Sequence, residues 1–193
     1  GWKLLFDGTS PTGWRGAHKD AFPDFGWVIE NGCLKVLASG GAESQAGGGI
    51  VTVGQYGNFD LFFEFMITEG ANSGVKYFVT EAYPTEGSAI GLEYQILDDQ
   101  RHPDALLGRD GNRTVASLYD LIPARNKRFN GVGQWNAAQI VSLNGHVEHW
   151  LNGFKVLEYE RGSDEYRRLV SESKYKIFEG FGEAEQGHIL LQD

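Results

Sequence analysis

The stretch GLEYQILDD, residues 91–99, combines the pattern of a β-strand with side chains that can do chemistry. Side chains alternate between the two faces of a strand, so Glu93 and Gln95 are expected on the face opposite the apolar side chains. A carboxylate can accept a proton as a general base, and an amide can both donate and accept hydrogen bonds. The chemistry available depends on what other groups the fold brings to this polar face.

Two further expected strands carry polar residues, and the first, FDLFFEFMI at residues 59–67, has Glu64 opposite a row of apolar side chains. The second, SGVKYFVT at residues 73–80, has Lys76 between apolar neighbours. If the three strands are neighbours, their polar side chains meet on one outer surface, with Phe78 among them. That surface would contain Glu64, Lys76, Glu93 and Gln95. Aromatic rings can cover the C–H faces of a sugar while polar groups pair with its hydroxyls, so the surface suits a carbohydrate; a plain solvated sheet face is the alternative.

A long, polar, glycine-rich segment follows at residues 99–134, and loops of this length in compact domains are often functional. Its RHPDALLG motif contains His102 and Asp104, which could bind a metal ion together with a carboxylate of the preceding Asp-Asp pair. Their spacing matches no established metal template, so a polar loop is the favoured interpretation. Elsewhere, His146 and His149 lie on opposite faces of one expected strand and cannot form a joint site. His149 shares its face with apolar residues and is expected to be a hydrogen-bonded core histidine.

The composition indicates an all-β protein. Among 193 residues, 27 are glycine and 13% are aromatic, and few stretches have helical periodicity. The net charge of −9 and the absence of a basic run argue against nucleic acid and anionic membranes as partners. The single cysteine, Cys33, excludes an internal disulfide. No apolar stretch approaches the ~18 residues of a membrane helix, and no leader peptide is recognised, so neither feature sets the localisation.

Turn signals divide the rest of the chain into antiparallel strands. Asn-Gly pairs, the strongest short hairpin signal, lie at residues 31–32, 144–145 and 152–153. One short helix is expected near residues 163–173, with Ser163 as its N-cap and acidic residues in its first turn. The pattern contains no repeat and no domain boundary. It predicts a single domain over residues 1–193, built as a β-sandwich of two antiparallel sheets.

Several segments together resemble one protein family. They are GWKLLFDGTSPTGW, NSGVKYF, GLEYQILDD, SLYDLIPA, WNAAQIVSLNGHVEHWLNG and GHILLQD, and they span essentially the whole chain. The resemblance is to the 3-keto-disaccharide hydrolase domain family, long a domain of unknown function, whose members are often labelled glycosyl hydrolases. It implies a concanavalin A-like jelly-roll fold and extracytoplasmic bacterial proteins, whether periplasmic, secreted or surface lipoproteins. Family members usually continue after LQD with a His-Gly turn and a further strand, so a final strand is expected beyond Asp193.

The resemblance implies that the substrate is a 3-keto-glycoside or 3-keto-disaccharide. A ketone at C3 of a sugar acidifies the proton on C2, so a base can remove that proton, the C1 substituent leaves, and water then adds. We expect Glu93 to be the base, and Lys76 or a divalent cation to stabilise the enolate. The other candidates are Gln95, Asn72 and Phe78 for contacts with the sugar, and Asp98, His102 and Tyr119 for acid or orienting roles.

Other functions fit the same residues. A conventional glycosidase uses two carboxylates, for which Glu64 and Glu93 are the candidate pair. A non-catalytic carbohydrate-binding module would need the aromatic and amide groups but no reactive carboxylate. A structural or adhesion domain would leave the polar face flat and uncovered by the 99–134 segment. The identity, linkage and anomer of the sugar, the metal requirement and the oligomeric state stay open at this point.

Overall fold

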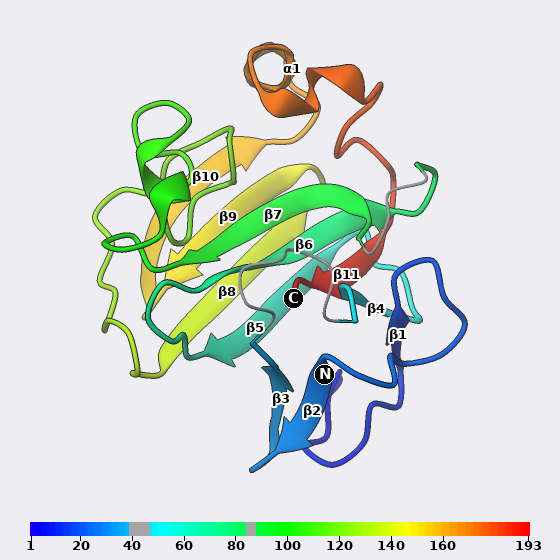
Figure 1. Cartoon of the computed structure of the whole chain (residues 1–193). Helices are drawn as coiled ribbons and strands as arrows, with labels where there is room; N and C mark the ends of the chain where they lie inside the picture. Colours follow the sequence, from blue (N-terminus) through cyan, green and yellow to red (C-terminus); the bar gives the residue numbers. More distant parts are fainter. Residues whose placement is uncertain (39–46, 84–87) are drawn as a thin grey trace.

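Two antiparallel β-sheets packed face to face form the body of the protein (Figure 1). The computed structural model describes residues 1–38, 47–83 and 88–193. The five-stranded sheet has the order β1 (Trp14–Gly16), β4 (Ile50–Thr52), β11 (His188–Leu191), β6 (Asn72–Thr80) and β7 (Ile90–Leu97). The four-stranded sheet has the order β10 (Phe154–Glu160), β9 (His146–Leu151), β8 (Asn136–Leu143) and β5 (Phe59–Phe65). With the small hairpin of β2 (Trp27–Glu30) and β3 (Cys33–Val36), this architecture confirms the predicted all-β sandwich.

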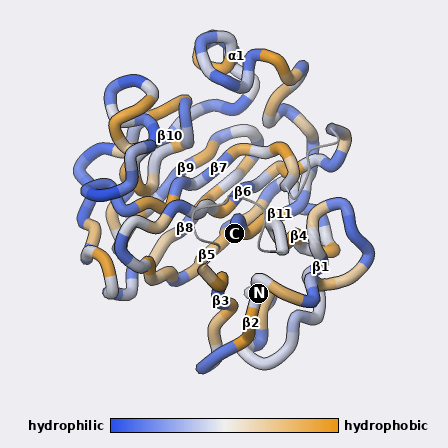
Figure 2. Tube along the Cα trace, viewed as in Figure 1, coloured by the Kyte–Doolittle hydropathy of each residue, from blue (hydrophilic) through white to orange (hydrophobic). Residues whose placement is uncertain are grey.

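The strands form because apolar and polar side chains alternate along them, which lets each sheet bury one face. Figure 2 shows this alternation as changes of colour along the strand traces. Every second residue of β9 is buried, and Leu151 at its end is fully buried. Tyr77 of β6 and Ile140 of β8 belong to the same core cluster. Phe63 of β5 packs edge-on against Tyr94 of β7, with ring centroids 5.5 Å apart, so the core lies between the two sheets.

The predicted Asn-Gly hairpin turns are present. In each pair both residues have positive φ: 52° and 78° at Asn31-Gly32, 52° and 93° at Asn144-Gly145, and 48° and 80° at Asn152-Gly153. These angles are typical of type I′ turns, whose twist matches that of the strands they join. The turns connect β2 to β3, β8 to β9 and β9 to β10.

A bulge interrupts β6 and corrects one prediction. The register with β7 shifts between Tyr77 and Thr80, and Phe78 has a φ of 50°. Because a bulge breaks the period of two, Phe78 does not join Lys76 on the polar face. Its ring is instead 1% exposed in the core, with the Arg161 guanidinium 3.8 Å from its centroid. The expectation that Phe78 contacts a ligand on the polar face is therefore wrong in its geometry.

The predicted helix is also present, as α1 (Asp164–Ser171). Ser163 caps it, since its hydroxyl accepts a hydrogen bond of 3.1 Å from the backbone N–H of Tyr166. Two short 3₁₀ helices, η1 (Pro103–Leu106) and η2 (Lys174–Ile177), lie in the connections. No helix in the described part of the chain is both long and apolar enough to cross a bilayer.

The long loop that follows β7 returns along the free edge of that strand. Residues 116–119, called here the edge segment, make three backbone hydrogen bonds with β7, at distances of 2.8, 3.1 and 3.0 Å. In order, these join Ala116 N to Gln95 O, Gln95 N to Ser117 O and Tyr119 N to Glu93 O. The loop therefore extends the five-stranded sheet and carries its own side chains to the polar face of β7.

Candidate active site

Glu93 and Lys76 lie directly opposite each other on neighbouring strands, β7 and β6. Glu93 is only 6% exposed, and Lys76 is partly buried. The carboxylate leans over Gly74, because a Cβ added at that position would overlap it. The glycine beneath Glu93 therefore leaves room for its carboxylate, and Glu93 and Lys76 share the outer face of the five-stranded sheet. The prediction that Glu93 and Lys76 lie close together on one sheet face is confirmed.

Two amides extend the polar surface around Glu93. Gln95 pairs with Gly74 in the register and is fully buried. With its amide turned so that both ends are satisfied, Gln95 Nε2 donates to Glu93 Oε1 at 3.1 Å. The side-chain amide of Asn72 lies 3.3 Å from the same Gln95 group. Glu93, Gln95 and Asn72 thus form one connected polar cluster, and the strand pattern had placed two of them, Glu93 and Gln95, on one face.

Tyr119 forms one wall of the site. Its backbone N–H is bonded to Glu93 O, and its neighbour Leu118 pairs with the core-facing Tyr94, so the Tyr119 ring is directed to the Glu93 side. Burial raises the pKa of Tyr119, and a hydrogen bond with Asp104 raises it further. The phenol is therefore a neutral group at physiological pH. It suits stacking and hydrogen bonding rather than proton donation.

Arg113 holds the loop segment that carries Tyr119 through two carboxylates. Its guanidinium bonds the Asp120 carboxylate through Nε at 2.8 Å and the Asp104 carboxylate through Nη1 at 2.9 Å. The Arg113 Cζ atom lies 5.3 Å from the Tyr119 ring centroid. Since both carboxylates are partly buried and paired, Arg113 is held as a structural cation. It fixes the loop that presents Tyr119.

Lys174 approaches the site from η2, and sequence patterns missed it. Its backbone N–H donates to Asp120 Oδ2 at 2.9 Å, and its ammonium lies 4.2 Å from the Tyr119 ring centroid. Much of the side chain is exposed, yet burial of the charged end lowers the pKa of Lys174, against the attraction of Glu93. Lys174 lies about 80 residues from Glu93 in the chain, and no local pattern connects the two.

Gln192 is a second residue that sequence reasoning missed. Its backbone N–H donates to Gly74 O at 3.0 Å, which places it beside the glycine beneath Glu93. Its side-chain Oε1 is buried and has no hydrogen-bond partner among the described residues. A buried acceptor without a partner is costly, so Gln192 has capacity to bind a hydroxyl group at this position.

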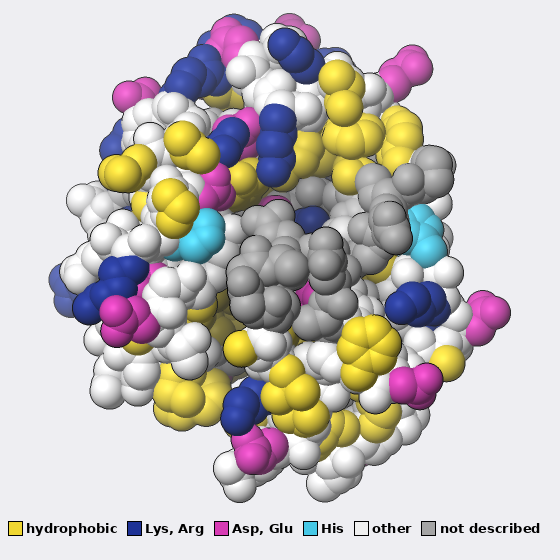
Figure 3. Space-filling model, in the orientation of Figure 1, with side chains coloured by type: hydrophobic (Ala, Val, Ile, Leu, Met, Phe, Trp, Pro, Cys, Tyr) yellow, Lys and Arg dark blue, Asp and Glu magenta, His cyan; other side chains and the backbone are white. Residues whose placement is uncertain are grey.

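The same face continues across the sheet as a mostly apolar floor. Leu190 of β11 pairs with Lys76 on one side and with Val51 of β4 on the other, and Arg15 of β1 pairs with Val51. At this far end Arg15 binds Glu81 through two hydrogen bonds of 3.0 and 2.6 Å, which lower the pKa of Glu81 to about 2. Figure 3 views the molecule from this side, and both acidic and basic side chains are visible in a hollow near its centre.

Glu64 lies elsewhere, which corrects another prediction. It belongs to β5, which pairs with β8 in the four-stranded sheet, and its side chain is exposed. The side chains of β5 alternate between buried and exposed as predicted. Alternation does not show, however, which sheet a strand joins. Glu64 and Glu93 therefore do not form the carboxylate pair of a conventional glycosidase.

Asp98 follows the end of β7, and His102 precedes the start of η1, so both make local hydrogen bonds that support the loop. Asp98 accepts hydrogen bonds from the backbone N–H groups of Gly70 (2.9 Å) and Gln100 (3.1 Å), and its pKa is lowered chiefly by the first of these. His102 caps η1, since its Nδ1 accepts from Asp104 N at 3.2 Å. Both residues thus hold the start of the long loop. The metal site considered for them is not assembled among the described residues.

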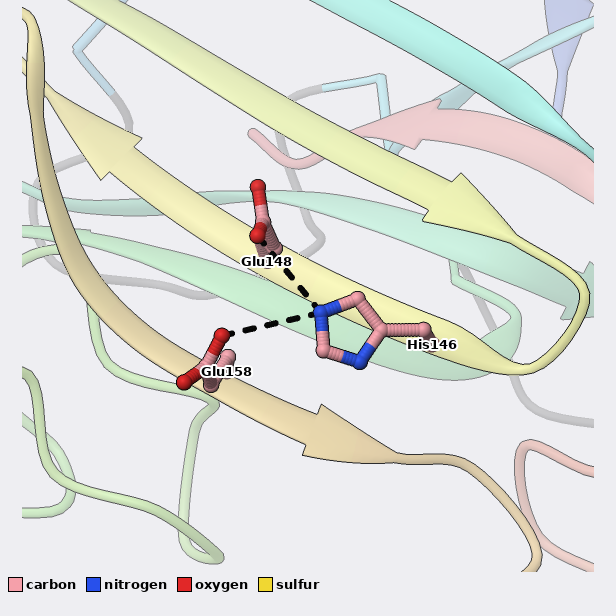
Figure 4. A group of neighbouring side chains, drawn as sticks. All are labelled: His146, Glu148 and Glu158. Carbon is pink, nitrogen blue, oxygen red and sulfur yellow. Dashed lines mark ion pairs between the residues drawn. The ribbon is translucent and has the colours of Figure 1, made fainter.

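Within the described ranges, a group with metal-binding geometry lies on the outer face of the four-stranded sheet (Figure 4). The ligand atoms of His146, Glu148 and Glu158 lie within 4.8 Å of one another. The Lys155 ammonium already bridges the two carboxylates, at 3.0 Å from Glu148 and 2.5 Å from Glu158. The hydrogen bond that His146 donates to the Glu160 carboxylate raises the pKa of His146. This cluster is an ion-pair network on the side of the sandwich opposite to Glu93.

His149 is the core histidine that the sequence predicted. It is fully buried, and burial lowers its pKa to about 4. Its Nδ1 lies 3.0 Å from Ala116 O and its Nε2 lies 2.8 Å from Tyr77 Oη. Because a carbonyl only accepts, Nδ1 carries the proton and Tyr77 donates to Nε2. The Tyr159 hydroxyl, 2.8 Å from that of Tyr77, completes a chain that fastens the edge segment to the four-stranded sheet.

Comparison with known proteins identifies relatives over the full chain. A family model described as the 3-keto-alpha-glucoside-1,2-lyase-like domain matches residues 1–193. A Bacteroides thetaiotaomicron protein described as a 3-keto-disaccharide hydrolase is 37% identical over 214 aligned residues, which cover 100% of this chain and 73% of that protein.

Solved structures agree with these sequence relatives. A Parabacteroides distasonis protein, provisionally described as a glycosyl hydrolase, superposes with a TM-score of 0.83 at 28% identity, over 99% of this chain and 86% of that one. A second protein of the same organism and description has a TM-score of 0.67 at 18% identity, over 98% of this chain and 75% of that one. The second likeness shows a shared fold.

Proposed function

The chain belongs to the 3-keto-alpha-glucoside-1,2-lyase-like domain family, and we propose that it is an enzyme that cleaves 3-keto-glycosides by elimination and hydration. The description of the Bacteroides relative as a 3-keto-disaccharide hydrolase supports this substrate class. The observation that carries the proposal is the pairing of the buried Glu93 carboxylate with Lys76 on one sheet face. A face used only for sugar binding would not need a desolvated carboxylate beside an ammonium group.

Glu93 removes the C2 proton in this mechanism. The C3 ketone draws the electron pair of the broken C–H bond into an enolate, and the Lys76 ammonium stabilises the negative charge on its oxygen. The bond between C1 and the glycosidic oxygen then breaks, which leaves a C1–C2 double bond. Water adds to C1 and a proton returns to C2, giving the free 3-keto-sugar. Asn72 holds a hydroxyl group of the sugar, and the Tyr119 ring covers a C–H face. The buried Gln95 amide orients the Glu93 carboxylate through its hydrogen bond.

A divalent cation is the alternative electrophile for the enolate. In the ranges that the structure describes, no group of three His, Cys, Asp or Glu ligands surrounds Glu93, and Lys76 already faces the carboxylate. The residues near Glu93 thus do not fit a closed metal site of that kind, and we assign the charge stabilisation to Lys76. A chelator in the assay tests this assignment.

A paired activity assay tests the proposed function. The protein is offered p-nitrophenyl glucoside and its 3-keto derivative, each with and without EDTA. We expect release from the keto sugar alone, unaffected by EDTA. Release from the plain glucoside would instead indicate a conventional glycosidase. Loss of activity with EDTA would show that a metal ion, and not Lys76, stabilises the enolate. Binding of the sugar without release, measured by calorimetry, would indicate a carbohydrate-binding module.

A further inference from the structure

The backbone of η2 holds Lys174 in a fixed place beside the site. The hydroxyl of Ser173 accepts a hydrogen bond of 3.0 Å from Tyr175 N, which caps the short helix. The Tyr175 ring stacks on Phe181 with centroids 4.0 Å apart, and the Lys174 N–H is anchored to Asp120. Three separate contacts therefore fix the position from which the Lys174 side chain extends.

Lys174 and Glu93 lie beside the same aromatic ring. Tyr119 is bonded to the backbone of Glu93 along the edge of β7, and the Lys174 ammonium lies over its ring. Within the residues that the structure describes, this ammonium contacts the rings of Tyr119 and Tyr175 and makes no hydrogen bond. The Lys76 ammonium differs in that it donates to Ser88 Oγ at 3.2 Å. Among the described residues, the N–H donors of the Lys174 ammonium are thus all available to a ligand.

We propose that Lys174 is the general acid that protonates the glycosidic oxygen as it leaves C1, an assignment that rests on the proposed function. Glu93 takes the C2 proton, the C1–O electron pair passes to the leaving oxygen, and the Lys174 ammonium gives that oxygen a proton. The step yields the free alcohol, an unsaturated 3-keto-sugar, protonated Glu93 and the Lys174 amine. In the hydration step the amine takes a proton from the attacking water and Glu93 returns its proton to C2, so both groups are restored.

The charges around Lys174 support this role. Lys76 on β6 and Arg113 on the long loop repel its ammonium, whereas Glu93 on β7 and Asp120 attract it. Burial is the largest effect, and the pKa of Lys174 is lowered. A lowered pKa makes the ammonium a stronger acid, which brings it closer to the range useful for proton transfer near neutral pH.

The test compares two leaving groups, because only one of them needs a proton. A 3-keto-glucoside of p-nitrophenol releases a stable anion, whereas methyl 3-keto-glucoside releases a basic alkoxide that requires an acid. We expect Lys174→Met to lower kcat/KM for the methyl glycoside by about 100-fold or more and for the p-nitrophenyl glycoside by less than about tenfold. Lys174→Arg, which keeps the charge but holds its proton, should behave in the same way. Lys176→Met, in the same helix and exposed, is the matched control and should retain activity on both.

Equal losses on the two substrates in Lys174→Arg would overturn the assignment, because they would indicate a role in binding or folding. Full activity of Lys174→Met on the methyl glycoside would overturn it as well. Thermal melting of each variant shows whether it is folded. If the wild-type protein cleaves neither 3-keto substrate, the proposed function itself fails, which separates that outcome from a failure of the Lys174 assignment alone.

Discussion

Glu93 and Lys76 face each other across β7 and β6, and the glycine at position 74 leaves the space in which the Glu93 carboxylate lies. The pair is set by backbone register rather than by flexible loops. Side chains on paired strands are held more precisely than side chains on loops, which is what positioned proton transfer requires.

Replacement of Glu93 by Gln removes the base while it keeps the shape of the side chain. We expect kcat for a 3-keto-glycoside to fall by about 10²–10⁴-fold, because general-base catalysis contributes that much, with sugar binding retained. Steady-state kinetics and calorimetry measure the two quantities. Glu64→Gln, exposed on the other sheet, should keep wild-type turnover. Full turnover by Glu93→Gln would remove Glu93 from the mechanism.

Replacement of Gly74 by Ala places a methyl group where the Glu93 carboxylate lies. We expect the free energy of unfolding to fall by about 1–3 kcal/mol and turnover to drop, because overpacking forces the carboxylate from its position. Chemical denaturation measures the first effect. The cost should shrink when Gly74→Ala is made in a Glu93→Ala background. An equal cost in both backgrounds would show that the methyl group clashes with something other than Glu93.

The Arg15–Glu81 pair should make stability depend on acid pH. The pKa of Glu81 in the folded protein is about 2, below its usual value of 4.5, so on acidification Glu81 is protonated in the unfolded chain before it is protonated in the folded protein. The stabilisation from the pair is therefore lost as the pH falls from 4.5 towards 2. Glu81→Gln should therefore cost about 1 kcal/mol at neutral pH, after allowance for solvent screening, and almost nothing near pH 2. Denaturation at several pH values checks this. A cost independent of pH would contradict the linkage.

His149 predicts a second pH effect with its own range. Burial lowers the pKa of His149 from 6.5 to about 4, so between these pH values the unfolded state binds more protons than the folded state. The free energy of unfolding therefore decreases as the pH is lowered from 6.5 to 4. The loss should reach about 3 kcal/mol at most, from 1.36 kcal/mol per pKa unit. In His149→Gln, which cannot titrate, the decline between pH 6.5 and pH 4 should be shallower than in the wild type. Parallel stability profiles of the two proteins would contradict this prediction.

Local sequence patterns located one part of the site, for physical reasons. Period-two alternation placed Glu93, Gln95 and Lys76 on one face, because a regular strand obeys it. The same rule failed at Phe78, where a bulge with positive φ turns the side chain into the core. It could not show that Glu64 belongs to the other sheet, since sheet membership depends on long-range pairing.

Lys174 and Gln192, which the sequence patterns did not identify, share their large separation from Glu93 along the chain. Each is brought to the site by contacts with other elements. No motif surrounds either residue. Their roles depend on how η2 and the end of the chain pack against the sheet, which single-sequence patterns do not encode.

The backbone bonds of the edge segment have a consequence for the behaviour of the protein in solution. An unpaired outer strand offers its N–H and C=O groups to strands of other molecules, and such edges promote aggregation. On β7 the C=O of Glu93 and both the N–H and C=O of Gln95 are already bonded to the protein's own Tyr119, Ser117 and Ala116. At the opposite edge of the same sheet, β1 is only three residues long. The contacts that bring Tyr119 to the site therefore also protect the sheet from pairing with a neighbouring molecule.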